Sequence, residues 1–378
     1  MMRIGIFGGT FNPVHSEHIL VARAAVKELN LDKLFIMPTF ISPHKNSMPA
    51  PAEDRLNMLK LVFSEDEKIE VSDYEIEKQG KSYTYLTVEY FKEKYDAELF
   101  FICGGDMLTN FKTWRYPERI LVACTLAVFD RENSFTDFDA EREYFKRTFS
   151  KDYIKLSHVG KNISSTKIRV YAAFSLSLAM LVEKEVEEYI KNKKLYQGNE
   201  YIEFVKCTLT DKRLVHTANV VVTALSKVKE LKLDEEKVIT ACILHDCAKY
   251  IDASTVTGFS IPDGMPHPVV HAFLGAHIAK NRLGINEEEI IDAIKYHTSG
   301  KANMTTLGKL VFVADMLEEG RNYEGVDYLR KLYNGSDFEA CFKECLREEY
   351  IHLQNKKSEI FVETINAYDY YIKDKKEG

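Results

Sequence analysis

The first half of the chain alternates short apolar runs with segments of helical periodicity. The apolar runs predict strands at Arg3–Gly9, Leu34–Pro38, Ile69–Tyr74, Leu99–Cys103 and Leu126–Phe129. Helical spacing of apolar residues predicts helices over Ser16–Leu29, Pro51–Phe63 and Thr84–Tyr95. This alternation is typical of βαβ units. We therefore expect an α/β, Rossmann-like domain with a parallel, doubly wound sheet.

The strand pattern disappears after about Val182, and the second half predicts an all-α domain. Helices are expected over Val182–Tyr196, Asp211–Leu231, Asp234–Lys249, Val269–Leu283, Glu287–His297, Leu307–Glu318, Phe338–Leu353 and Lys357–Lys373. The turn signal Gln197-Gly198-Asn199 is the best boundary between the two patterns. We expect one domain over residues 1–197 and a second over residues 198–378.

Composition supports a folded protein of two domains. The chain has 378 residues, of which 45% are hydrophobic and 29% charged, which excludes a disordered or low-complexity chain. The 51 basic and 58 acidic residues give a net charge of −7, which argues against a nucleic-acid binder.

Several features predict a cytoplasmic location and no membrane partner. The 7 cysteines are odd in number and form no CxxC pair, so a secreted disulfide framework is not expected. The N-terminus lacks the layout of a signal peptide. The longest uncharged apolar stretch, Val170–Val182, is too short to cross a bilayer and predicts a packed helix. The sequence leaves open whether the chain forms a homo-oligomer.

The stretch GGTFNPVHSEHI, which begins at Gly8, predicts a phosphate site. Gly8 and Gly9 let the backbone approach a ligand closely, and the N–H groups of a helix beginning near Ser16 favour phosphate. The stretch is neither a Walker A loop nor GxGxxG. His15 and His18 are three residues apart, so they share one helix face. Their imidazoles suit phosphoryl or nucleotidyl transfer, where they would donate to oxygens that gain charge.

A second stretch, ISSTKIR from Ile163 to Arg169, predicts an anion site. Its hydroxyl residues are good N-caps, and Arg169 adds a cation that binds phosphate well. Taken alone, the stretch fits an ordinary capped helix equally well.

Together the two stretches resemble the HxGH nucleotidyltransferase superfamily, with its GxFxPxHxGH and ISSTxIR signatures. Glu17 stands where that family usually has glycine, and a side chain there would crowd the nucleotide or alter the helix start. A degenerate binding module is therefore an alternative. Further motifs narrow the resemblance, over residues 1–197, to bacterial nicotinate-nucleotide adenylyltransferases. They are Pro43-His44-Lys45, Ser82-Tyr83-Thr84, and the stretch from Ile102 through Gly104-Gly105-Asp106 to Phe111 and Trp114.

That resemblance implies transfer of AMP from ATP to nicotinate mononucleotide, with Mg²⁺, to give deamido-NAD and pyrophosphate. It implies catalytic roles for His15, His18, Lys45 and Arg169. It implies nucleotide contacts from Gly8, Gly9, Thr10, Phe11, Thr84, Asp106, Trp114, Ser165 and Thr166. Trp114 would stack on the nicotinate ring, although a core position is equally compatible with the sequence. Other acceptors remain open, namely nicotinamide mononucleotide, phosphopantetheine and glycerol phosphate.

The second half contains histidines and carboxylates set in apolar segments. His245-Asp246 lies inside an apolar segment, where burying an unpaired carboxylate is costly. Mixed nitrogen and oxygen ligation suits a divalent transition metal, and six candidates suggest two ions. The candidates are His216, His245, Asp246, His271, His297 and Asp315. The remaining histidines here, His267, His277 and His352, are expected to be structural or surface residues.

The motifs RLVHT, LHDCAK, HTSGKANM and VADMLEEGR resemble HD-domain metal-dependent phosphohydrolases over residues 198–378. The resemblance is closest to bacterial symmetrical diadenosine tetraphosphate hydrolases, with Glu319 at a position where they usually have proline. It implies cleavage of diadenosine tetraphosphate to two ADP, with iron or a similar metal. Asp246 would bridge two ions, and Lys249 and Arg321 would bind phosphate. A nucleotide phosphatase or a non-catalytic nucleotide sensor remains an alternative.

Overall fold

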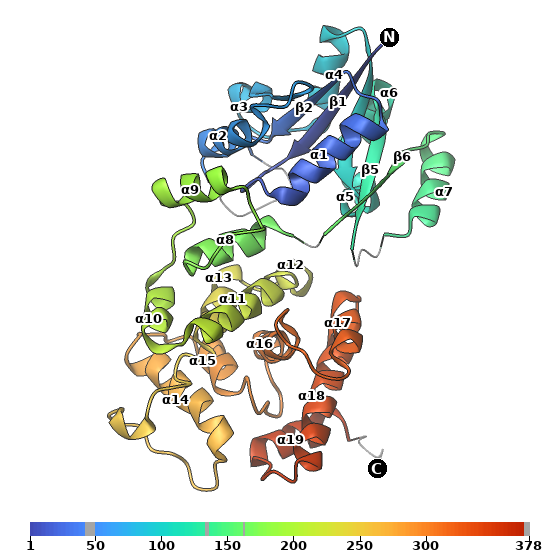
Figure 1. The fold of residues 1–378 in the computed structure, drawn as a ribbon. Coiled ribbons are helices and arrows are strands. Elements are labelled where there is room, and N and C mark those ends of the chain that lie inside the picture. Colours follow the sequence, from blue (N-terminus) through green and yellow to red (C-terminus); the bar gives the residue numbers. More distant parts are fainter. Residues whose placement is uncertain (42–49, 133–135, 162, 374–378) are drawn as a thin grey trace. The chain divides into compact units, whose positions relative to one another are not determined.

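The structure is a computed structural model that describes residues 1–41, 50–132, 136–161 and 163–373. The chain divides into two compact units (Figure 1). The first contains Met1–Arg169 and Ser177–Tyr196, and the second contains Val170–Leu176 and Gln197–Gly378. The second unit therefore includes a short segment that precedes the end of the first.

The first unit is built on a six-stranded sheet in the order β3-β2-β1-β4-β5-β6. The strands are β1 (Met2–Gly9), β2 (Lys33–Pro38), β3 (Ile69–Val71), β4 (Ala97–Gly104), β5 (Thr125–Arg131) and β6 (Ile154–Gly160). All five neighbouring pairs are parallel, which confirms the doubly wound sheet. The strand order reverses between β1 and β4. Ligands of such sheets bind beyond the carboxyl ends of the strands at this switch point, where Gly8 and Gly9 lie.

Helices connect these strands and cover the sheet. They are α1 (Ser16–Glu28), α2 (Ala52–Phe63), α3 (Tyr74–Lys78), α4 (Thr84–Lys94), α5 (Gly105–Thr109), α6 (Pro117–Ala123), α7 (Phe138–Phe149) and α9 (Lys184–Asn192). One further helix, α8 (Ser165–Ala173), begins in the first unit and ends in the second. The expected strand Ile69–Tyr74 ends at Val71, because Tyr74 already begins α3.

The second unit contains helices joined by turns, with no strand among its described residues. Its helices are α10 (Glu200–Thr208), α11 (Asp211–Leu225), α12 (Val228–Leu231), α13 (Glu235–Leu244), α14 (His267–Asn281), α15 (Glu288–Lys295), α16 (Thr306–Leu317), α17 (Val326–Asn334), α18 (Phe338–Asn355) and α19 (Val362–Tyr371). One continuous apolar core includes Phe312, Phe342 and Phe174. Among the described residues, none of the helices combines the length and hydropathy needed to span a bilayer.

Three expected helices are interrupted. The segment expected over Asp211–Leu231 breaks after Leu225, and the helix expected over Asp234–Lys249 ends at Leu244. Successive residues of a regular helix point about 100° apart, so a turn after Leu244 lets His245 and Asp246 both face inward. The helix expected over Val170–Val182 ends at Ala173, and the chain then follows turns to Glu183.

Two candidate active sites

The loop between β1 and α1 forms the first candidate site. Phe11 in this loop has a positive φ of 47°. Two side chains of α8 bind the loop backbone: Ser165 Oγ donates to Pro13 O at 3.0 Å, and an Arg169 guanidinium N–H donates to Asn12 O at 2.9 Å. The structure thus brings together the GGTF and ISSTKIR stretches, which are about 150 residues apart in sequence. Lys45 lies outside the described residues.

His15 and His18 stack at the start of α1. His15 precedes the first residue of the helix, and the two ring centroids are 3.6 Å apart. The His15 backbone N–H donates to His18 Nδ1 at 3.3 Å. Because Nδ1 of His18 accepts, the proton of the neutral ring lies on Nε2. His18 therefore presents a donor, which suits a phosphate oxygen.

His15 is expected to remain neutral through the acidic range. Burial, and then the charge of Arg131, lowers the pKa of His15 from 6.5 to about 3. The unfolded chain binds this proton first, so His15 makes the free energy of unfolding fall as the pH drops from 6.5 towards 3. Histidine ¹⁵N chemical shifts recorded between pH 4.5 and 8 should show a neutral His15 in the folded protein and a titrating one in urea. A folded-state titration near pH 6.5 would contradict the burial argument.

Basic side chains surround this histidine pair. His15, His18, Arg131 and Lys161 line one small pocket together with Glu17. Their chemistry favours an anion, and the single carboxylate is the exception. Two cations beside two imidazoles are suited to a polyphosphate.

Glu17 is buried with 6% exposure, and its carboxylate faces β6. Its Oε2 lies 3.5 Å from His158 Nε2, and neither atom makes a hydrogen bond. A Cβ at Gly160 would lie only 3.0 Å from Oε2, so glycine at this position makes room for the carboxylate. The side chain thus has space against β6 while it lines the same pocket as the two histidines.

Arg55 is a site residue that the sequence interpretation missed. Its buried guanidinium donates to three backbone carbonyls, those of Thr10 at 2.8 Å, Ala50 at 3.0 Å and Phe40 at 3.2 Å. These hydrogen bonds hold the loop between β1 and α1 against the chain segments that contain Phe40 and Ala50. The signal was available, because Arg55 falls within the apolar face of α2 beside Leu56 and Leu59.

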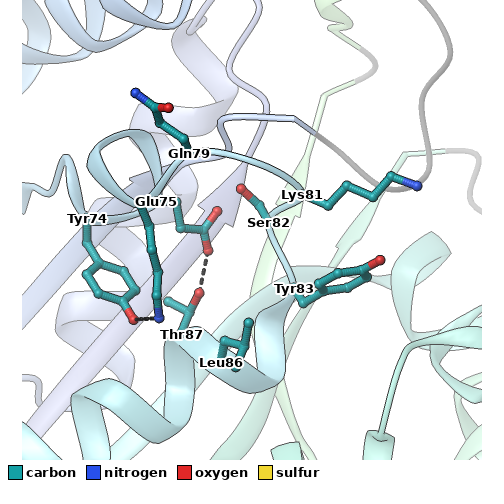
Figure 2. A pocket seen from close by; sticks show the side chains of 9 residues that line it. Tyr74, Glu75, Gln79, Lys81, Ser82, Tyr83, Leu86 and Thr87 are labelled. Carbon is teal, nitrogen blue, oxygen red and sulfur yellow. Dashed lines mark hydrogen bonds between the residues drawn. The ribbon is translucent and has the colours of Figure 1, made fainter.

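The Ser82-Tyr83-Thr84 motif lies beside a second pocket, shown in Figure 2. Glu75 lines this pocket and accepts a hydrogen bond from Thr87 at 2.5 Å, and burial raises the pKa of its carboxyl. Ser82 Oγ accepts from the Phe40 backbone N–H at 3.0 Å. These contacts fix the motif at the end of β2, with Thr84 as the first residue of α4.

The two other residues expected near the pyridine ring differ in exposure. Asp106 is exposed on α5, directly after the end of β4. Trp114 is 8% exposed, and its ring centroid lies 5.9 Å from that of Phe101 and 5.2 Å from that of Phe111. The Trp114 ring therefore takes the core position, and its contact with a substrate stays a prediction.

The six expected metal ligands of the second unit converge on one cluster. They form three overlapping groups: His216, His245 and Asp246; His245, His297 and Asp315; and Asp246, His271 and His297. Within each group the candidate ligand atoms lie within 4.8 Å of one another. The residues come from α11, α14 and α16 and from the turns after α13 and α15.

Hydrogen bonds from Nδ1 orient the His245 and His297 rings so that Nε2 faces the cluster. His245 Nδ1 lies 2.7 Å from Cys242 O, and His297 Nδ1 lies 2.8 Å from Ile294 O. A carbonyl only accepts, so both Nδ1 atoms carry the proton and the Nε2 atoms face the cluster as acceptors. The carbonyls are available because α13 and α15 end here.

The donor set fits a divalent cation. Burial lowers the pKa of His245, and burial lowers that of His271 to about 4, so both rings are neutral and available to a metal ion. Asp246 Oδ1 is buried and lies 2.9 Å from His271 Nε2, yet it has no hydrogen bond. Arg213 and Lys249 offset part of the cost of burying this carboxylate. A carboxylate oxygen without a hydrogen bond beside imidazole nitrogens can still coordinate a divalent cation.

Three basic side chains border the cluster. Arg213 Nη1 lies 2.8 Å from Asp246 Oδ2, and Arg321 contacts Asp315 and donates to its backbone carbonyl at 2.7 Å. Lys249 Nζ lies 3.1 Å from His271 Nε2. Lys249 and Arg321 were expected, whereas Arg213 was missed. It lies three residues before His216, on the same face of α11, and that spacing could have revealed it.

Comparison with known proteins finds a family match in each half of the chain. Residues 6–170 match the cytidylyltransferase-like family, and residues 213–320 match the HD domain. The chain is thus a nucleotidyltransferase followed by an HD domain, a domain that binds divalent metal. A *Clostridium novyi* protein named a probable nicotinate-nucleotide adenylyltransferase is 36% identical over 52% of this chain and 100% of its own length. The chain belongs to the nicotinate-nucleotide adenylyltransferase family.

A *Mycoplasma* relative extends across both units, whereas two solved structures each match about half of the chain. A *Mycoplasma genitalium* protein named a probable nicotinate-nucleotide adenylyltransferase/Ap4A hydrolase is 29% identical over 85% of this chain and 89% of its own. A solved *Clostridium acetobutylicum* protein, described as a predicted HD superfamily hydrolase involved in NAD metabolism, is 29% identical. It covers 46% of this chain and 95% of its own, with a TM-score of 0.42. *Plasmodium falciparum* nicotinic acid mononucleotide adenylyltransferase is 20% identical over 53% of this chain and 99% of its own, with a TM-score of 0.44.

Proposed function

We propose that the chain is a bifunctional cytoplasmic enzyme. Residues 1–197 transfer AMP from ATP to nicotinate mononucleotide, giving deamido-NAD and pyrophosphate, a step of NAD biosynthesis. Residues 198–378 hydrolyse diadenosine tetraphosphate to two ADP. The observation that carries the proposal is the presence of both a histidine pair at the switch point and a six-ligand cluster in one chain. They occur in the order of the two activities in the *Mycoplasma* relative's name.

In the first site, the residues act by positioning and by neutralising charge. His18 donates from Nε2 to a phosphate oxygen, and His15, Arg169 and Lys45 hold the triphosphate of ATP. Ser165, Thr166 and the Gly8–Phe11 backbone complete the phosphate cradle, while Thr84, Asp106 and Trp114 bind nicotinate mononucleotide. Mg²⁺ bound with ATP supplies further charge neutralisation. No covalent intermediate is needed, because alignment of the two substrates supplies much of the rate.

In the second site, the six ligands hold iron or a similar divalent metal, as two ions. When bound, such ions supply an activated water and a clamp on a phosphate oxygen. Arg213, Lys249 and Arg321 bind the tetraphosphate bridge, and Asp246, which belongs to two of the three candidate ligand groups, would be shared by the two ions. A guanidinium can release its carboxylate partner and pair with phosphate instead.

The decisive test is product analysis with the purified full-length chain. With ATP and Mg²⁺, nicotinate mononucleotide should give deamido-NAD, and nicotinamide mononucleotide should react more slowly. With Fe²⁺ or Mn²⁺, diadenosine tetraphosphate should give ADP as its only nucleotide product. Reaction with phosphopantetheine instead would overturn the first assignment. Release of ATP and AMP, or no hydrolysis with metal bound, would overturn the second.

Replacing Glu17 by glycine should change the adenylyltransferase kcat/KM by less than about threefold. The carboxylate already has space against β6, so its removal relieves little crowding. Steady-state kinetics with ATP as the varied substrate would measure the effect. Glu17→Ala controls for the added flexibility of glycine in the first turn of α1. A gain of tenfold or more in both variants would instead support a degenerate wild-type site.

A further inference from the structure

A buried carboxylate lies behind the candidate metal ligand His216. Glu318 is 3% exposed, and its Oε1 lies 3.1 Å from His216 Nδ1. Its Oε2 accepts from Asn219 Nδ2 at 3.0 Å and from the Gly320 backbone N–H at 2.6 Å. A carboxylate of this kind only accepts, so Nδ1 of His216 carries a proton. The ring then offers Nε2, which lies 3.1 Å from Asp315 Oδ1, to the cluster.

The contacts behind Glu318 fix the orientation of the Asn219 amide. Its NH₂ group must face the carboxylate, so its carbonyl oxygen faces away from Glu318. That oxygen accepts the hydroxyl proton of Tyr171 at 2.8 Å. Burial raises the pKa of Tyr171 to about 12, so the hydroxyl keeps its proton at neutral pH. Tyr171 therefore donates to Asn219, and Asn219 and His216 both donate to Glu318.

Tyr171 comes from a part of the sequence that precedes the boundary expected near residue 198. It lies in Val170–Leu176, which belongs to the second compact unit. Phe174 of the same segment is 2% exposed within the apolar core of that unit. A Cβ at Gly198 would lie 2.7 Å from Ala173 O, so this glycine permits the segment to pack closely. The segment is thus an integral part of the helical unit.

We propose that Tyr171, Asn219 and Glu318 form a positioning relay that holds the His216 ring for divalent metal binding. The proposal rests on the metal centre proposed for the second unit. A partner behind a histidine ligand fixes its tautomer and ring orientation, and losing it typically costs about 10- to 100-fold in metal affinity. The relay extends this dependence to Tyr171, whose hydroxyl is connected to His216 through Asn219 and Glu318.

The test measures Mn²⁺ binding to the metal-stripped full-length chain, with the EPR signal of free Mn²⁺ as the readout. Glu318→Gln places an amide donor against the donors of Asn219, Gly320 or His216, and should weaken binding about tenfold or more. Tyr171→Phe leaves Asn219 Oδ1 without its donor and should weaken binding about threefold. Tyr333→Phe is the matched control, because that buried hydroxyl donates to Thr223 O at 2.8 Å, outside the relay. Its affinity should equal that of the wild type.

A double variant separates a relay from a general loss of structure. If Tyr171 acts through Glu318, Tyr171→Phe should have little further effect in the Glu318→Gln background. The relay is wrong if Tyr171→Phe binds Mn²⁺ as tightly as Tyr333→Phe does. It is also wrong if Tyr171→Phe weakens binding equally in the wild-type and Glu318→Gln backgrounds. Either result would leave the proposed metal centre intact. If the wild type itself binds no Mn²⁺, the metal centre and the relay are both wrong.

Discussion

Replacing Asp246 by asparagine should lower diadenosine tetraphosphate hydrolysis by about a thousandfold, equivalent to about 4 kcal/mol of activation free energy. Asp246 belongs to two of the three ligand groups, and its Oδ1 lies 2.9 Å from His271 Nε2 and 3.6 Å from His297 Nε2. Asparagine keeps the shape but removes the charge that binds a cation. Metal content, measured by mass spectrometry of the purified variant, should fall with the activity. Replacing both His245 and Asp246 by alanine should remove both.

The chain supplies its own controls for this experiment. The adenylyltransferase activity of Asp246→Asn should remain, because the catalytic residues proposed for it lie in the first unit. Asp327→Asn is a matched charge change on α17, where Asp327 is exposed and pairs only with Arg330 among the described residues. It should leave metal content unchanged. Hydrolysis that persists in Asp246→Asn without bound metal would contradict the metal-dependent mechanism.

The predicted and missed strands differ in burial. β1, β2, β4 and β5 have buried runs of at least four residues, which appear in the sequence as continuous apolar segments. The edge strand β6 buries only two of its seven residues and was missed. Its neighbour α7 buries only Phe145, so its sequence reads as charged surface. β3, at the opposite edge, buries only Ile69 and was nevertheless predicted, so the apolar pattern identified every strand of the sheet except β6.

The candidate metal ligands are conspicuous in the sequence, whereas the residues behind them are not. A histidine or aspartate in an apolar segment is conspicuous, because burying it is costly without a partner. Glu318 follows the apolar helix α16 and is succeeded by Glu319 in a charged turn, so its sequence suggests exposure. Its burial depends on Asn219, 99 residues earlier. Nothing local to Tyr171 indicates that it packs with the second unit, since its helix begins in the first.

Replacing His18 by alanine should lower the adenylyltransferase kcat by about 100-fold, the usual effect of removing one donor to a developing negative charge. The His15 backbone N–H donates to Nδ1 of His18, which leaves Nε2 as the donor of the neutral ring. Alanine keeps the helix while losing that donor. Because the interaction strengthens as charge develops, the KM for ATP should change much less than kcat. Diadenosine tetraphosphate hydrolysis by the same preparation is the internal control and should be unchanged. A His18→Ala enzyme with full kcat would show that His18 does not stabilise the transition state. A rise in KM alone would mean that His18 only binds ATP in its ground state.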